Sequence, residues 1–247
     1  MPQVSESKYM VQAGWDHVPH LDETTKRQLL DSTPLHLQAA RSTGQPSLGS
    51  GAIYPVIENE ITYNPFEIPS YWPRCFGMDV GWNRTAAIWL ARDPSTLRVY
   101  AYAEHYRGRA EPIVQAKAIQ ARGDWIPGVI DPASRQSNQK DGSVLFEEYK
   151  NLGLQLRPAV NAREFGLEKV YQMLTTGMLL ISRACQETLN ELRKYHRDEN
   201  GKIVKTDDHL MDSLRYGVVS GLDIATTEVR RDVMQIASAP GDPRVAY

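Results

Sequence analysis

Three apolar segments follow one another between residues 75 and 104, separated only by short polar turns. They are Cys75–Val80, Ala86–Ala91 and Leu97–Glu104, and the turns between them read GWNRT and RDPST. Short apolar runs that are rich in aromatic and β-branched residues and bounded by turn formers predict strands. The sequence therefore predicts three consecutive strands linked as hairpins.

Helices and strands alternate after these three strands. The expected elements are a helix at 111–121, a strand at 128–130, a helix at 144–151, a strand at 154–157, a helix at 164–175, a strand at 178–182, a helix at 185–196 and a closing helix at 207–221. Hairpin-linked strands followed by β-α units predict an α/β fold, a mixed sheet with helices on both faces. This order of elements is also that of ribonuclease H-like folds.

The regions on either side of this core differ from it in composition. Residues 1–70 contain a helix expected at 23–31 and a Gly/Ser/Pro-rich stretch at 42–51, but few apolar anchors. We therefore expect a linker and the remnant of a preceding domain there. Residues 71–223 form the expected folded domain, and residues 224–247 are expected to be a flexible polar tail.

The overall composition limits the classes of function. The 247 residues are 41% apolar and 23% charged with a formal net charge of −2, which is typical of a soluble globular protein. A surface that faces nucleic acid would have to be a local patch. The chain has two cysteines, no signal-peptide pattern and no apolar run of the roughly 20 residues that cross a bilayer. We expect a cytoplasmic protein with reduced thiols and no membrane contact.

Acidic residues recur at three points of the pattern. Asp79 lies inside the first strand, although strands disfavour Asp and a buried carboxylate is costly without a cation or several donors. Asp131 follows the strand at 128–130, at a strand end where α/β sheets bind ligands. Asp208 and Asp212 are four residues apart on the closing helix, so their carboxylates share one face.

Each acid taken singly also has a structural explanation. Asp207 or Asp208 can cap the closing helix, and Asp131 before Pro132 can be a turn residue. Asp79 is the hardest to explain in this way. Together the acids suit a two-metal nuclease, because Mg²⁺ takes oxygen ligands and two ions about 3.5–4 Å apart can activate a water and stabilise the leaving oxygen in phosphodiester hydrolysis.

Three segments, FGMDVGW, VIDPAS and DDHLMDSLRYG, resemble the nuclease domain of the large terminase subunit of tailed bacteriophages. The stretch from Gly14 to Val56 is similar to the end of the terminase ATPase domain and the linker that follows it. The resemblance implies an RNase H-like endonuclease of the DNA-packaging motor, which cuts concatemeric double-stranded viral DNA in the host cytoplasm. It also implies three partners: the ATPase domain of the full-length protein, the portal protein and the small terminase subunit.

The same resemblance implies a site. Its metal ligands would be Asp79, Asp131 and an acid of the closing helix, Asp212 first and Asp208 second, holding two Mg²⁺ or Mn²⁺ ions with His209 nearby. Asn200-Gly201 predicts a hairpin beside this site. Candidate DNA contacts are Arg84, Arg135, Lys140, Lys202 and Lys205. For any one of these basic residues a solvated surface charge is the alternative.

Other functions stay open at this point. The chain has no G-x-x-x-x-G-K-[ST] motif, and GQPSLGSG lacks the lysine, so no ATPase site is assigned to it. A junction-resolving nuclease on the same fold and a non-catalytic module that docks on the portal or small terminase are the alternatives, and the chain is too short for the second lobe of an actin-like ATPase. The tryptophans at 72, 82, 89 and 125 lie on different expected elements, which favours core and rim positions over a base-stacking platform.

Overall fold

The computed structural model describes residues 3–5, 8–9, 14–18, 20–31, 42, 51–132, 145–198 and 200–228. The N-terminal elements are strands β1 (Gln3–Ser5) and β2 (Lys8–Tyr9), a 3-10 turn at Trp15–His17, helix α1 (Glu23–Asp31) and the short helix α3 (Glu58–Ile61). The later strands are β3 (Thr62–Tyr63), β4 (Arg74–Asp79), β5 (Thr85–Arg92), β6 (Val99–Arg107), β7 (Gly128–Ile130), β8 (Leu156–Pro158) and β9 (Leu179–Ser182). The later helices are α4 (Pro112–Gln120), α5 (Leu145–Asn151), α6 (Arg163–Thr175), α7 (Gln186–Lys194) and α8 (His209–Tyr216), which continues into a π-helical turn at Gly217–Gly221.

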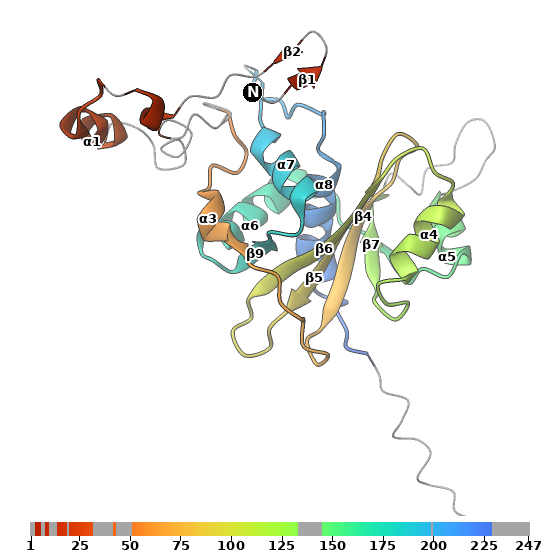
Figure 1. Ribbon diagram of the computed structural model, residues 1–247. Helices are drawn as coiled ribbons and strands as arrows, with labels where there is room; N and C mark the ends of the chain where they lie inside the picture. Colours follow the sequence, from red (N-terminus) through yellow and green to blue (C-terminus); the bar gives the residue numbers. More distant parts are fainter. Residues whose placement is uncertain are drawn as a thin grey trace, which may run out of the picture.

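Among the described residues, seven strands form one sheet in the order β3-β9-β6-β5-β4-β7-β8. Strands β4, β5 and β6 pair antiparallel, as hairpin-linked strands do, whereas β7, β8, β9 and β3 join the sheet in parallel. Helices α6, α7 and α8 cover one face and α4 and α5 the other (Figure 1). The expected mixed α/β sheet with helices on both faces is confirmed. No helix in the described ranges is long and apolar enough to span a bilayer.

The expected elements are present, with shifted ends. The largest shifts are in β6, which extends to Arg107, and in α8, which begins at His209 and not at residue 207. The backbone of Asp207 has a left-handed φ of 53°, which a right-handed helix cannot include, so Asp208 becomes the N-cap residue. Asp208 and Asp212 nevertheless keep their spacing, because the amide of Asp212 donates to the carbonyl of Asp208 at 2.9 Å.

Part of the segment 1–70 packs into this fold. Strand β3 extends the sheet beside β9, and Tyr54 and Ile61 are buried in the core on the side of α6, α7 and α8. The amide of Ile53 donates to the carbonyl of Tyr195 at 3.0 Å. An edge strand of two residues is too short to show an alternation of apolar and polar residues. The sequence therefore predicts only a linker where β3 lies. The domain boundaries at residues 70 and 223 stay predictions, with residues 53–63 sharing the core of the sheet.

Alternation along β4 decides which face of the sheet each side chain reaches. Phe76 and Met78 pack with the core on the side of α4 and α5, whereas Cys75 packs on the other side. Since side chains alternate with a period of two, Gly77 and Asp79 share the face of Cys75, which α8 covers. Asp79 is therefore directed to the helix that carries the other predicted acids.

The helix α8 rests directly on the backbone of β4. A Cβ atom at Gly77 would lie 2.0 Å from the carbonyl oxygen of Ser213 and 2.7 Å from the amide nitrogen of Gly217. A Cβ at Gly217 would in turn lie 2.8 Å from a methyl group of Leu90. The two glycines thus allow a closer approach of helix and strand than any side chain would.

We expect Gly77→Ala to destabilise the protein by about 3 kcal/mol or more, the upper end of the range for overpacking, because the new methyl group meets backbone atoms that cannot rotate away. Gly177→Ala is the control, since no described atom lies within 4 Å of its Cβ position and the backbone φ of 67° is the main cost, about 1–2 kcal/mol. Urea denaturation of both variants measures the difference. Equal losses of stability would show that the contact of α8 with β4 is not tight.

Candidate active site

Asp79 ends strand β4 in a mostly buried position. Its Oδ2 atom lies 2.8 Å from Nδ1 of His209, the first residue of α8. Burial raises the pKa of Asp79, the hydrogen bond and charge of His209 act against this, and the carboxylates of Asp212 and Asp131 raise it further. The hydrogen bond to Asp79 raises the pKa of His209 above its ordinary value. Asp79 and His209 therefore form a partly buried pair that is joined by this hydrogen bond.

Asp131 is placed by the sheet and by the end of α8. Its amide donates to the carbonyl of Met78 at 3.0 Å, which continues the ladder between β7 and β4. The hydroxyl of Tyr216 donates to Oδ1 of Asp131 at 3.1 Å. Asp131 thus lies beside Asp79 on the neighbouring strand, as the position at a strand end predicts.

Asp212 is held by a fully buried arginine one turn further along α8. The Nε and Nη2 atoms of Arg215 donate to the same oxygen, Oδ1, at 3.2 and 2.8 Å. The Arg215 side chain is 0% exposed, and its guanidinium lies 4.4 Å from the ring centroid of Tyr216. A buried guanidinium is stable only with such a partner, and here it fixes the orientation of the carboxylate through one of its two oxygens.

A glycine makes room for this arginine. A Cβ atom at Gly166 of α6 would lie 2.7 and 2.9 Å from the Cγ and Cδ atoms of Arg215. The aliphatic stem therefore passes directly against the backbone of α6. The spacing of Asp212 and Arg215, three residues apart on a helix, is a signal that the sequence contains, but the burial of the arginine is not visible in it.

The four acids form one electrostatic group. Burial raises the pKa of Asp208, and the charge of Asp212 raises it further, as does that of Asp79. Asp79 and Asp208 are therefore both affected by neighbouring carboxylates, and a cation bound among the acids would lower this repulsion. Carboxylate oxygens in this density suit a hard divalent ion such as Mg²⁺ or Mn²⁺ rather than Zn²⁺.

The described acidic side chains do not surround a common position that a metal ion could occupy. Within the described ranges, no group of three or more His, Cys, Asp or Glu side chains is in an arrangement that could hold a metal ion. The hydrogen bonds explain this, because His209, Tyr216 and Arg215 each turn one carboxylate toward a protein donor. The residue types fit a divalent cation, because carboxylate oxygens are the ligands that such ions prefer.

A buried glutamate caps the N-terminus of α8. Glu191 of α7 is 2% exposed, and its Oε2 accepts hydrogen bonds from the amides of Leu210 and Met211 at 2.6 and 3.2 Å. Burial raises the pKa of Glu191, while these amide hydrogen bonds lower it. The sequence suggests Asp207 or Asp208 for this role, but within the described chain the Asp208 side chain makes no capping hydrogen bond. Nothing local in the sequence separates Glu191 from an ordinary surface charge.

A carboxylate also caps the N-terminus of α7. Glu104 of β6 accepts hydrogen bonds from the amides of Glu187 and Thr188 at 3.0 and 2.8 Å, and from the Thr188 hydroxyl at 2.7 Å. These amides are the unpaired donors of the first turn of α7. A carboxylate of the sheet thus fixes α7, and a carboxylate of α7 fixes α8.

The predicted DNA contacts fall in three places. Arg84 follows β4, with its guanidinium 4.3 Å from the ring centroid of Tyr106. Lys202 and Lys205 are exposed on the predicted hairpin, which is present and closed by an antiparallel bridge between Arg197 and Ile203. Arg135 and Lys140 lie outside the described residues.

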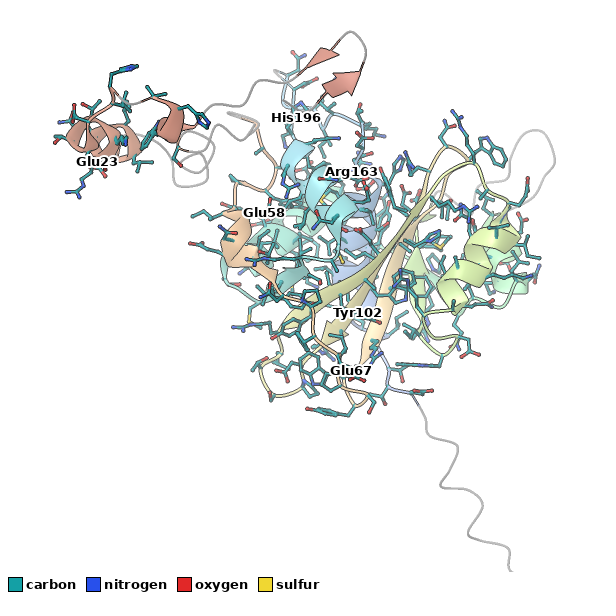
Figure 2. All side chains as sticks on the ribbon, in the orientation of Figure 1. Glu23, Glu58, Glu67, Tyr102, Arg163 and His196 are labelled. Atoms are coloured by element: carbon teal, nitrogen blue, oxygen red, sulfur yellow. The ribbon has the colours of Figure 1, made fainter. Side chains whose placement is uncertain are left out.

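The carboxylates lie at one end of the sheet. Arg163, at the start of α6, lies toward this end and Glu67 toward the opposite end, where β4 begins (Figure 2). The first of these ends is formed by the last residues of β4, β6 and β7 and by the first turn of α8.

Similarity to known proteins identifies the family of this chain. A family model described as the terminase RNaseH-like domain matches residues 76–220. The chain belongs to the terminase RNase H-like domain family. It is 30% identical over 229 residues to the large terminase subunit of Enterobacteria phage LP7, covering 88% of this chain and 48% of that protein.

Two solved terminase structures share the fold. The large terminase nuclease domain of phage P22 is 28% identical with a TM-score of 0.67, covering 76% of this chain and 99% of that domain. The large terminase nuclease of the thermophilic phage G20c, solved with bound magnesium, is 15% identical with a TM-score of 0.50, covering 70% of this chain and 99% of that one. The chain spans about half the length of the curated relatives it matches. Its ribonuclease H-like fold, predicted from the order of elements, is confirmed.

We expect Glu191→Ala to lower the free energy of unfolding by about 2–3 kcal/mol, since two amides of α8 lose a charged acceptor in a buried place. Glu191→Gln should lose less, because its amide oxygen can still accept. Glu168→Ala, an exposed acid within α6, is the control and should change stability by no more than about 0.5 kcal/mol. Urea denaturation measures all three, and a loss for Glu191→Ala as small as that of the control would contradict the capping role.

Proposed function

We propose that this chain is the nuclease part of a large terminase, a metal-dependent endonuclease that cleaves concatemeric double-stranded viral DNA during genome packaging. The observation that supports this most is the convergence of Asp79, Asp131 and Asp212 from β4, the end of β7 and α8 at one end of the sheet. Membership of the terminase RNase H-like domain family is the second observation that supports a nuclease.

Two Mg²⁺ or Mn²⁺ ions are the proposed cofactors. The G20c nuclease that shares this fold has been solved with magnesium, and the donor set here is made of the hard oxygens that this ion prefers. Asp79, Asp131 and Asp212 would hold the ions, with Asp208 as a further oxygen donor. When bound, such ions activate a water and stabilise the leaving oxygen of the phosphodiester.

The protein's own groups orient these ligands. Arg215 holds one oxygen of Asp212, Tyr216 holds one oxygen of Asp131, and Nδ1 of His209 is hydrogen-bonded to Oδ2 of Asp79. Partners of this kind fix the direction of a metal ligand and are typically worth about 10–100-fold in affinity or activity. Arg84, Lys202 and Lys205 are the proposed phosphate contacts, together with Arg135 and Lys140.

The wider assignment follows from the relatives. We propose that the chain acts with the ATPase domain of a complete large terminase, and with the portal protein and the small terminase subunit, in the cytoplasm of an infected cell. The relatives named as large terminase subunits support this placement.

We expect the purified chain to nick and linearise supercoiled plasmid with Mg²⁺ or Mn²⁺ and not with EDTA. Asp79→Asn, Asp131→Asn and Asp212→Asn should each lower the rate about a hundredfold or more, since even partners outside the ligand set are worth about 10–100-fold. Asp208→Asn should lose less than Asp212→Asn. Asp124→Asn, an exposed acid before β7, is the matched control and should cut at the parent rate. A parent chain that cuts with none of these metals, or an Asp79→Asn variant that cuts like the parent, would contradict the proposal.

A further inference from the structure

An exposed tryptophan follows Asp79 closely in the sequence. Trp72 and Trp89 are buried in the core, but Trp82 is 62% exposed. It follows Asp79 by three residues, so its Cα lies within about 10 Å of that of Asp79. A single exposed aromatic residue is normal on a protein surface, but Trp82 lies in the loop that follows Asp79 and its carbonyl accepts a hydrogen bond from an arginine-rich turn.

The backbone around Trp82 is held in place by the end of β6. The amide of Arg109 donates to the carbonyl of Trp82 at 2.8 Å, and a Cβ atom at Gly108 would lie 1.9 Å from the carbonyl oxygen of Asn83. Arg109 also has a left-handed φ of 53°, a conformation that is uncommon for residues other than glycine and that tends to occur at functional sites. Residues 81–84 and 107–109, named here the ridge, are therefore one preorganised unit.

The ridge is positively charged. Arg84, Arg107 and Arg109 belong to it, and the sequence has no Asp or Glu in 80–84 or in 107–110. Arg107 and Arg109 are exposed, whereas Arg84 lies over the ring of Tyr106. Arg107 is paired with Thr85 across the sheet, one step from the pairing of Ala86 with Asp79. By the alternation of side chains, Arg107 shares the face of His105 and not that of Asp79, so its guanidinium suits a phosphate that lies beyond the carboxylates along a bound duplex.

We propose that the ridge is a docking surface for duplex DNA, in which the arginines bind phosphates and the Trp82 indole contacts the bases from a groove. Proteins that combine arginines with an apolar wedge bind duplexes in this way. The inference rests on the proposed nuclease function and adds to it a residue that positions the substrate. A protein partner is the alternative occupant, but binding of a protein does not require a surface of arginines at the loop that follows Asp79.

The first test compares duplex binding by variants in an Asp79→Asn background, which does not cut, by fluorescence anisotropy over a range of salt concentrations. Trp82→Ala should bind about tenfold more weakly with an unchanged salt slope, because an apolar contact releases no counterions. Trp82→Phe should recover most of the affinity. Tyr71→Ala is the matched control: Tyr71 is 67% exposed, lies near the opposite end of the sheet, and should bind like the parent.

The second test uses Arg107→Ala with Arg109→Ala. This double variant should weaken binding and lower the salt slope by about 2, since each phosphate contact contributes about 0.9. A Trp82→Ala variant that binds like Tyr71→Ala, or a double variant with the parent slope, would overturn the ridge.

The two proposals fail separately. If the parent chain cuts plasmid while the ridge variants bind normally, the ridge alone is wrong. If the parent cuts nothing while the ridge variants lose binding as expected, the ridge stands and the nuclease function is wrong.

Discussion

The rest of the candidate site depends on a close contact between two backbones, that of β4 and that of α8. Gly77 leaves no room for even a methyl group under Ser213 and Gly217, so helix and strand meet without intervening side chains. This contact determines the distance between α8 and the sheet. Because Asp79 lies two residues beyond Gly77 on the same face, the first turn of α8 arrives directly over it, and His209 reaches Asp79 at 2.8 Å. A longer distance between helix and strand would separate the acids of α8 from that of β4.

The second constraint is electrostatic. Burial raises the pKa of Asp79 and of Asp208, and neighbouring carboxylates raise the pKa of both further. The fold opposes this with fixed donors: Arg215 on Asp212 and Tyr216 on Asp131. It also fixes the helices from a distance, since Glu104 of the sheet caps α7 and Glu191 of α7 caps α8. A divalent cation would bind among carboxylates that His209, Arg215 and Tyr216 already hold by hydrogen bonds.

The sequence predicts this fold well where its signals are local. The apolar runs of β4, β5 and β6 are bounded by turn residues, and the alternation of side chains along a strand assigns Asp79 to one face of the sheet. Asp131 is found because a strand end before proline is visible in the chain. The rest depends on contacts that are distant in sequence. Glu191 and Glu104 cap helices that begin elsewhere, and β3 exists only because β9 supplies a partner. The hydrogen bond between the amide of Arg109 and the carbonyl of Trp82 likewise joins two loops that are distant in sequence, and no spacing reveals it.

The most direct test of the proposed metal centre is a crystal structure of this chain with saturating Mn²⁺, with the ion located by its anomalous scattering. We expect two peaks beside Asp79, with Asp131 and Asp212 rotated toward them and the contact of Gly77 with α8 unchanged. Oxygen ligands at the short distances typical of hard divalent ions would identify each donor. An absence of Mn²⁺ at these carboxylates, with Asp79, Asp131 and Asp212 still bound to His209, Tyr216 and Arg215, would contradict a metal-dependent nuclease centre at this end of the sheet.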